Sequence, residues 1–122
     1  MAKQLILCNC SGTQPLDPKA LSQATGLSCS PLHTALCGDE VESAAKAIST
    51  GEAVICCAQE KRFFAALAEE IEAPEPPCID LRDRAGWTAD SGDLIPKMSA
   101  LVAEAALELA PAKTLDVTSE GL

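Results

Sequence analysis

Aromatic side chains are scarce in this chain: Phe63, Phe64 and Trp87 make up 2% of its residues, and tyrosine is absent. Proteins that bind single-stranded nucleic acid stack bases on aromatic rings, so this composition disfavours that function. Basic residues are also few, 9 against 18 acidic ones, which leaves a formal net charge of −9. Because this charge repels a polyanion, we expect no nucleic-acid partner. An acidic surface fits ordinary solvation or docking to basic patches of a partner.

Long apolar runs are missing as well. No stretch approaches the ~20 residues that a membrane-spanning helix requires. The N-terminal segment MAKQLILCNC carries one lysine and only a short apolar stretch, so it lacks the pattern of a secretory signal. We therefore expect a cytoplasmic protein without a membrane span, in which lasting disulfides are rare.

Apolar residues are nevertheless abundant enough to build a core. They make up 48% of the 122 residues, which fits one domain of modest size. We expect a single α/β domain at 1–110. The polar segment 111–122 is expected to be a C-terminal tail, or the start of a linker to a further domain.

Strand-like and helix-like segments alternate along the expected domain. Asp17 and Pro18 mark the start of one helix and Gly26 marks its end. The expected strands cover 3–8, 32–37, 52–58 and 78–83, and the expected helices cover 18–25, 40–50, 59–71 and 94–110. This alternation predicts a small doubly wound, flavodoxin-like parallel sheet of four strands in the order 2-1-3-4, with helices on both faces.

Cysteine is the residue type that most needs an explanation, because the chain has 7 of them. An odd number cannot pair completely, and the cytoplasm disfavours pairing, so metal or redox chemistry is the better expectation. Some cysteines act simply as small buried hydrophobic residues, and we expect that role for Cys29 and Cys78. The others are Cys8, Cys10, Cys37, Cys56 and Cys57.

These other cysteines all fall where an expected strand ends. Cys8 and Cys10 end the first strand, Cys37 the second, and Cys56 and Cys57 the third. The carboxyl ends of parallel strands share one edge of the sheet, where such folds bind ligands. Converging thiolates suit zinc or an iron–sulfur cluster. The C-x₂-C pairs of zinc ribbons and ferredoxins are absent, so spacing alone leaves this choice open.

The turn after the first strand is expected to contribute backbone amides to this site. Ser11 and Gly12 can turn their N–H groups towards sulfur and stabilise negative charge there. The starts of the following helices, close to Cys37 and Cys57, are expected to favour thiolates in the same way.

Four segments of the chain together resemble the N-terminal domain of heterodisulfide reductase A-like proteins and related bacterial iron–sulfur proteins. They are LILCNCSGT (5–13), LHTALCGDEVESAAKAI (32–48), AVICCAQEKRFFAAL (53–67) and CIDLRDRAGW (78–87). The resemblance implies a [4Fe–4S] cluster and an electron-transfer module at the front of a larger redox protein. The implied partners are a redox protein or further domains of the same polypeptide.

The same resemblance implies a ligand set. Cys8 and Cys10 match the C-x-C motif of the family, Cys37 its second-strand cysteine, and Cys57 its third-strand cysteine. Cys56 stands at a family alanine, although it could replace Cys57. Ala85 stands near the last family cysteine, so that ligand is missing here. An exposed cluster is oxidised by air, so the cofactor can be absent from protein prepared aerobically.

Two other functions compete with this one. The first is a thiol–disulfide oxidoreductase that uses Cys8 and Cys10, or Cys56 and Cys57. The second is a structural or docking domain without metal. It remains open whether the chain is an enzyme, and an electron-transfer domain is the stronger expectation.

Several other residues have an ordinary structural explanation. We expect His33 to be a surface or satisfied polar residue more often than a metal ligand. Trp87 is expected in the core. Arg82 and Arg84 are expected as surface charges more often than as residues that form hydrogen bonds near the site or hold a partner. The acidic runs GDEVE (38–42) and EEIE (69–72) fit solvated helix faces.

Overall fold

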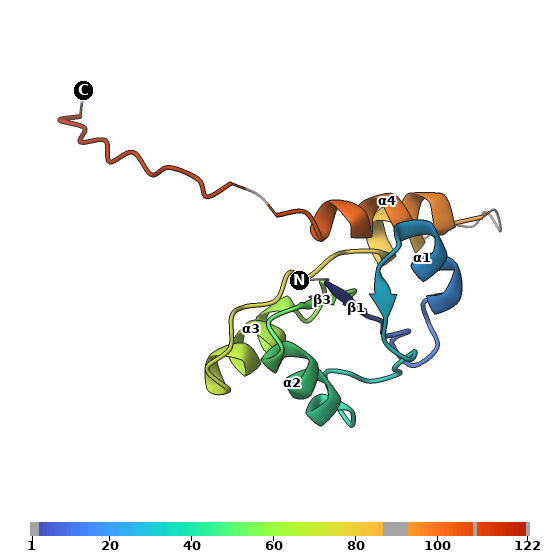
Figure 1. The fold of residues 1–122 in the computed structure, drawn as a ribbon. Coiled ribbons are helices and arrows are strands. Elements are labelled where there is room, and N and C mark those ends of the chain that lie inside the picture. The colour runs from blue at the N-terminus through green and yellow to red at the C-terminus, as the bar shows by residue number, and fades with distance from the viewer. Residues whose placement is uncertain (1–2, 87–92, 109, 122) are drawn as a thin grey trace.

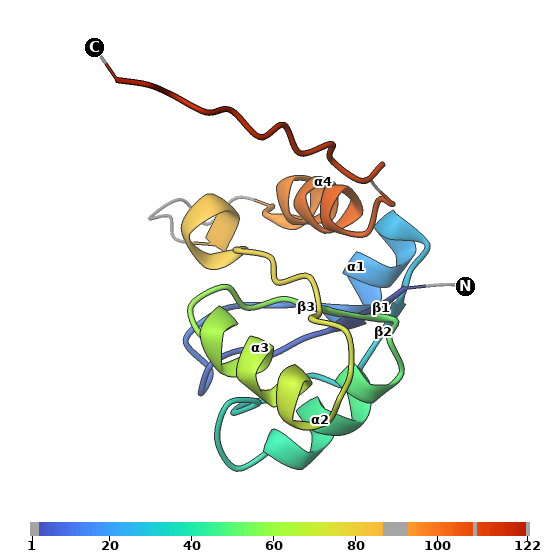
Figure 2. The same cartoon turned by 90° about the vertical axis from the view of Figure 1, so that its left-hand side faces the viewer.

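The computed structural model describes residues 3–86, 93–108 and 110–121. A parallel sheet forms its centre, with β1 (Gln4–Ile6) between β2 (Ser28–Cys29) and β3 (Ala53–Ile55). Helices α1 (Pro18–Thr25) and α4 (Ile95–Ala105) lie on one side of it, and α2 (Val41–Ser49) and α3 (Lys61–Glu70) on the other (Figures 1 and 2). The predicted α/β class, the parallel pairing and the two helical layers are present.

The two faces of the sheet bury alternate residues of the same strands. On the side of α1 and α4, the core contains Leu5, Leu7, Val54 and Cys56. On the side of α2 and α3, it contains Ile6, Cys8, Ala53 and Ile55. Because successive side chains of a strand point to opposite faces, a strand that is covered on both faces must be apolar throughout. This explains the continuous apolar runs that the sequence shows around residues 5–8 and 53–56.

Helix α1 has the ends that its sequence predicts. The side chain of Asp17 accepts a hydrogen bond from the Ala20 N–H at 3.0 Å, and Pro18 occupies the first turn. Gly26 ends the helix with a φ of 71°, a left-handed conformation that glycine adopts without strain. Its buried Leu21 belongs to the same core as Met98 and Val102 of α4.

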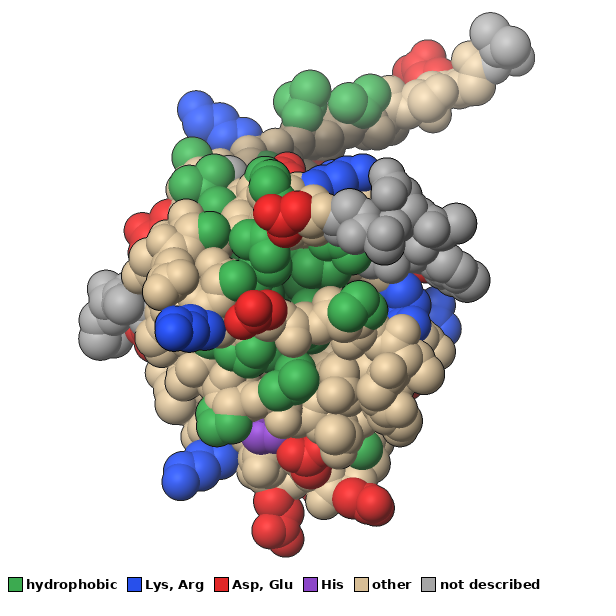
Figure 3. Space-filling view, turned by 90° about the vertical axis from the view of Figure 1, so that its right-hand side faces the viewer, with side chains coloured by type: hydrophobic (Ala, Val, Ile, Leu, Met, Phe, Trp, Pro, Cys, Tyr) green, Lys and Arg blue, Asp and Glu red, His purple; other side chains and the backbone are tan. Residues whose placement is uncertain are grey.

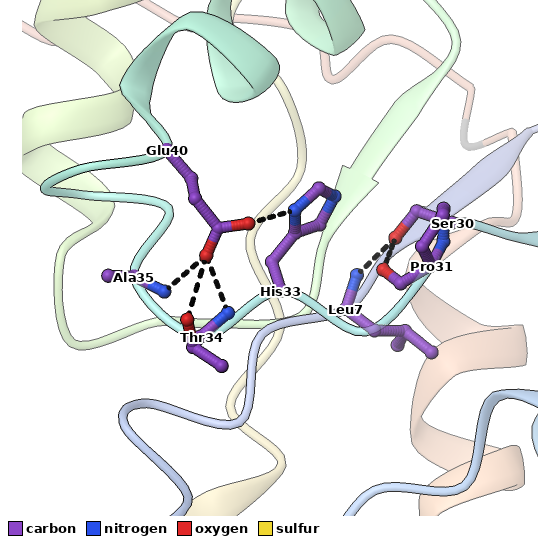
Figure 4. Close-up of polar contacts among 7 residues, drawn as sticks. All are labelled: Leu7, Ser30, Pro31, His33, Thr34, Ala35 and Glu40. Atoms are coloured by element: carbon purple, nitrogen blue, oxygen red, sulfur yellow. Dashed lines mark hydrogen bonds and ion pairs between the residues drawn. The ribbon is translucent and has the colours of Figure 1, made fainter.

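The second strand differs from its prediction. It was expected at 32–37, but β2 is formed by Ser28 and Cys29, which pair with Gln4 and Leu5. Further along, only His33 bridges to the β1 side, opposite Cys8. At the interruption, the Leu7 N–H donates to the Ser30 side chain at 3.0 Å instead of to backbone (Figure 4).

The fourth strand was also predicted wrongly, so the sheet has three strands instead of four. Of the segment 78–83, only Cys78 pairs, in a single bridge to Ile55 on the free edge of β3. The chain then turns, since the Asp80 carboxylate accepts the Asp83 N–H at 2.9 Å, and continues as the π-helix η1 (Arg82–Gly86). The expected position of Trp87 lies outside the described residues.

The last helix is shorter than its predicted range of 94–110, because α4 ends at Ala105. Beyond Val102, none of the described residues is buried, so no apolar face extends the helix. Residues 110–121 run as an exposed tail away from the body (Figure 1). Across the part of the chain that the structure describes, no helix has the length and apolar character to cross a membrane.

Candidate metal centre

A cavity of about 550 Å³ opens at the edge of the sheet where the parallel strands end. Its walls come from the loops after β1 and β3, from the loop before α2 and from the start of η1. Five of the seven cysteines line it, namely Cys8, Cys10, Cys37, Cys56 and Cys57. Cys29 and Cys78, which we expected to be structural, do not belong to its lining. Topology thus brings the thiols from three separate loops to one place.

Cys8 and Cys10 both line this cavity, but they differ in their surroundings. Cys8 is 9% exposed and packs in the core on the side of α2 and α3. Cys10 is exposed, lies beyond β1 and has a φ of 52°. The alternation of a strand therefore does not extend to Cys10, and a left-handed turn positions its thiol instead.

The backbone amides of this turn are not directed at the thiols as expected. The Ser11 N–H donates to the Thr34 carbonyl oxygen at 2.8 Å, and the Gly12 N–H donates to Asn9 Oδ1 at 2.9 Å. The expected amide nest at Ser11 and Gly12 is therefore wrong. The Ser11 hydrogen bond instead fixes the loop of Cys10 to the segment that leads to Cys37, and the Gly12 hydrogen bond lies within the loop of Cys10.

Glu40 holds the loop that carries Cys37. Its Oε1 accepts hydrogen bonds from the Thr34 N–H at 2.7 Å, the Ala35 N–H at 2.8 Å and the Thr34 hydroxyl at 3.0 Å (Figure 4). Its Oε2 lies 2.7 Å from His33 Nδ1. The His33 contact first, and then the backbone donors, lower the pKa of Glu40 to about 2. Glu40 was expected only as part of a solvated surface, so the sequence analysis missed this role.

Cys56 and Cys57 are adjacent in sequence but belong to different environments. Cys56 is 1% exposed in the core on the side of α1 and α4, and burial raises its pKa to about 12. Cys57 packs against the opposite core. Burial raises the pKa of Cys57 too, while hydrogen bonds from the backbone of Glu60 and Gln59 act in the opposite direction. Those two amides precede α3, so Cys57 has the helix-start environment that the sequence predicted.

The thiols lie close enough to influence one another. Burial raises the pKa of Cys37, and the Glu60 carboxylate and the thiols of Cys57 and Cys8 raise it further. Among the residues described, however, no three His, Cys, Asp or Glu side chains are gathered as ligands of one metal ion would be.

Two polar side chains of the cavity wall were not marked as such by the sequence. Arg82 lines the cavity, and its Nη2 donates to the Thr13 hydroxyl at 2.8 Å, which closes the loop of Cys10 against η1. Gln14 is 6% exposed, and its Nε2 is buried without a hydrogen-bond partner. By contrast, Arg84 and His33 are not part of the lining. Only the position of Gln14 directly after the CNCSGT turn could have drawn attention to it.

Comparison with known proteins returns no match to a family model, a curated protein or a solved structure.

Proposed function

We propose that the protein is an electron-transfer module that holds one [4Fe–4S] cluster through Cys8, Cys10, Cys37 and Cys57. The observation that carries the proposal is the single cavity lined by these thiols, which come from loops far apart in the sequence. A core that used cysteine only as a small hydrophobic residue would have no reason to gather them at one opening. Four thiolates are the usual ligand set of such a cluster.

The size of the cavity is sufficient for a cluster. A volume of about 550 Å³ lies in the range of small-molecule sites, roughly 300–1,000 Å³. In a cubane cluster each thiolate binds a different iron, so the sulfurs stand further apart than around one zinc ion.

The chemistry of the donors is consistent with this role. In the chain as described, burial keeps the thiols of Cys37 and Cys57 in their neutral form, since it raises their pKa values. Iron ions reverse this preference, because a bound cation stabilises the thiolates and binding releases their protons. When bound, the cluster would accept and donate single electrons. The chain supplies a partly buried pocket and the positioning of the thiols by Glu40 and Arg82.

The raised pKa values of Cys56 and Cys57 disfavour a thiol–disulfide oxidoreductase that uses this pair. The attacking group in such an enzyme is a thiolate with a lowered pKa, whereas the pKa values of Cys37, Cys56 and Cys57 are all raised. Cys56 and Cys57 also pack against opposite cores. From the resemblance to the heterodisulfide reductase family, we also propose that the partner is a redox protein or further domains of the same polypeptide. The proposed location of the protein is the cytoplasm.

The test is an iron and sulfide count on protein purified and reconstituted without oxygen. We expect about four of each per chain and a broad absorbance near ~400 nm. Cys57→Ala should abolish the cluster and Cys56→Ala should retain it, which makes this neighbouring pair its own matched control. Wild-type protein that binds no iron would refute the function and leave a structural or docking domain. If Cys56→Ala loses the cluster and Cys57→Ala keeps it, the ligand is Cys56 and not Cys57.

A further inference from the structure

The turn that carries Cys10 has an unfavourable backbone conformation. Cys10 and Ser11 have φ angles of 52° and 57°, in the left-handed region that residues other than glycine rarely adopt. Such a conformation persists only where the surrounding contacts hold it. The contacts of this turn therefore decide where the Cys10 thiol lies.

Backbone hydrogen bonds hold the first half of the turn. The Asn9 N–H donates to the His33 carbonyl oxygen and the Ser11 N–H to the Thr34 carbonyl oxygen, both at 2.8 Å. The amides of residues 12–14 donate within the turn. Among the described residues, the one hydrogen bond that reaches this second half from outside the turn comes from a side chain, that of Arg82.

Arg82 is linked to Cys10 through one hydroxyl group. Its Nη2 donates to the Thr13 hydroxyl at 2.8 Å, and that hydroxyl donates to the Cys10 carbonyl oxygen at 2.7 Å. A hydroxyl has one proton to donate and lone pairs to accept, so both bonds exist together. Arg82 Nη2 therefore lies no farther from the Cys10 carbonyl oxygen than these two bonds laid end to end.

The backbone of Arg82 is firmly anchored on its own side. Leu81 and Ala85 are both buried in the core beneath α1 and α4, and the Ala85 N–H donates to the Leu81 carbonyl oxygen at 3.0 Å. Arg82 lies between them and lines the cavity. The hydrogen bond to Thr13 thus attaches a strained turn to a fixed part of the wall.

We propose that Arg82 is a positioning residue which, through Thr13, holds the Cys10 turn in the conformation in which Cys10 binds the cluster. This inference rests on the proposed function. In the turn as it is held, the Cys10 thiol is near enough to Cys57 to raise the pKa of that thiol. Without the bond, the turn is free to relax towards ordinary backbone conformations. The exposed Cys10 then withdraws, and one iron of the cluster loses its thiolate.

The test is oxidation of the anaerobically reconstituted protein with ferricyanide. An iron without a thiolate leaves on oxidation: [4Fe–4S]²⁺ gives [3Fe–4S]⁺, Fe²⁺ and one electron, which ferricyanide accepts. The three-iron product is paramagnetic and the starting cluster is not, so electron paramagnetic resonance follows the conversion. Arg82→Met and Thr13→Val remove the donor and the acceptor of the bond. Both should convert faster than wild type, as should Cys10→Ala.

Three conservative variants serve as controls. Thr13→Ser keeps the hydroxyl and should convert at the rate of wild type. Arg84→Met, at an exposed position of η1 outside the cavity lining, should also behave as wild type. Arg82→Lys keeps a cationic donor and should convert more slowly than Arg82→Met.

A second measurement uses the cluster-free protein. Hydrogen exchange of the amides of residues 12–14, measured by nuclear magnetic resonance, reports how often the turn opens. Loss of one hydrogen bond in Arg82→Met or Thr13→Val should speed this exchange by about two- to tenfold. Thr13→Ser and Arg84→Met should leave it unchanged.

The outcomes separate this inference from the proposed function. If wild-type protein binds no iron, the function fails and the inference fails with it. If wild type carries a cluster and both Arg82→Met and Thr13→Val convert at its rate, only the inference is overturned. Fast conversion in Arg82→Met alone also overturns it, because the arginine then acts without the hydroxyl. Should Arg82→Met take up no cluster, Thr13→Val must still convert fast, and unchanged amide exchange in Thr13→Val overturns the inference.

Discussion

Single residues hold the loops of this site, and Glu40 is the clearest case. One carboxylate binds two backbone amides, a hydroxyl and an imidazole, all of them from residues 33–35. The segment 33–36 is in turn fixed to the first loop, because the His33 carbonyl oxygen accepts the Asn9 N–H at 2.8 Å. Glu40 thus acts on the position of both Cys37 and Cys10 without touching either.

This arrangement predicts a specific loss of stability in acid. The pKa of Glu40 is lowered in the folded protein from an ordinary 4.5 to about 2, so the folded state stabilises the ionised form of this side chain. Its contribution is complete above about pH 5 and is lost as the pH falls towards 2. Urea unfolding of wild type and Glu40→Gln should differ most at pH 6, and the two curves should approach each other near pH 2. A difference that stays constant over this range would contradict the assignment.

A second prediction concerns the thiol of Cys37. The Glu60 carboxylate raises its pKa, so Glu60→Gln should lower that pKa and leave more thiolate at a given pH. Alkylation of Cys37 in the cluster-free protein at pH 8, followed by peptide mass spectrometry, should be faster in this variant. Glu75→Gln is the control, because the Glu75 carboxylate raises the pKa of Cys78 and is not among the causes at Cys37. Equal rates in wild type and Glu60→Gln would rule out the interaction.

At the scale of elements, periodicity predicted the helices better than the strands. The helices α1, α2 and α3 and the strands β1 and β3 follow from apolar spacing and from end signals such as Asp17 and Gly26. Both edge segments were predicted wrongly, since a side-chain hydrogen bond at Ser30 and a carboxylate turn at Asp80 decide where their backbone stops pairing. Such bonds join residues that no periodic pattern connects.

The candidate site was predictable to the extent that it depends on topology. Thiols that follow neighbouring parallel strands approach one edge, and Cys8, Cys10, Cys56 and Cys57 line the cavity after β1 and β3. Cys37 also lines it, but from the loop before α2 and not from the end of the second strand, where it was predicted. Roles that depend on loop conformation could not be predicted, because they need three-dimensional contacts. The left-handed turn at Cys10 and Ser11, the unsatisfied amide of Gln14 and the network of Glu40 are of this kind.

The left-handed turn gives a test at this scale. Gly12 has a φ of 78°, and a Cβ added there would meet nothing within 4 Å. The substitution Gly12→Ala is therefore unfavourable because of the backbone conformation and not because of a steric clash. We expect it to destabilise the fold by about 1 kcal/mol. Gly38→Ala is the matched control in the next loop, where the added Cβ makes only an ordinary contact at 3.8 Å with Ala35. If denaturation shows equal effects at both glycines, conformational strain is not the cause.

The whole molecule consists of a compact body and an extended tail. Residues 110–121 are exposed throughout, and Leu115 and Val117 are 83% and 79% exposed (Figures 1 and 3). Within this described segment, the hydrogen bond found is local, from the Gly121 N–H to the Ser119 hydroxyl. The tail thus adds no packing to the body.

Deletion of residues 111–122 should therefore leave the body unchanged. We expect a thermal midpoint within about 1 °C of the full chain, because no buried surface is lost. The iron content after reconstitution should also be equal in both proteins. A lower midpoint in the shortened protein would show that the tail packs against the body in solution.

The residues that line the cavity lie far apart in the sequence, and this has a consequence for biosynthesis. Lining residues extend from Cys8 to Asp83, and each parallel pair of strands requires a complete crossover before it can form. At translation rates of about 5–20 residues per second, Cys8 and Cys10 emerge several seconds before Cys57 and Arg82. The nascent chain cannot hold a cluster during this interval, and its first two thiols are open to oxidants. Under the proposed function, assembly of the cluster would therefore be post-translational, and its donor would have to deliver iron and sulfide to an already folded acceptor.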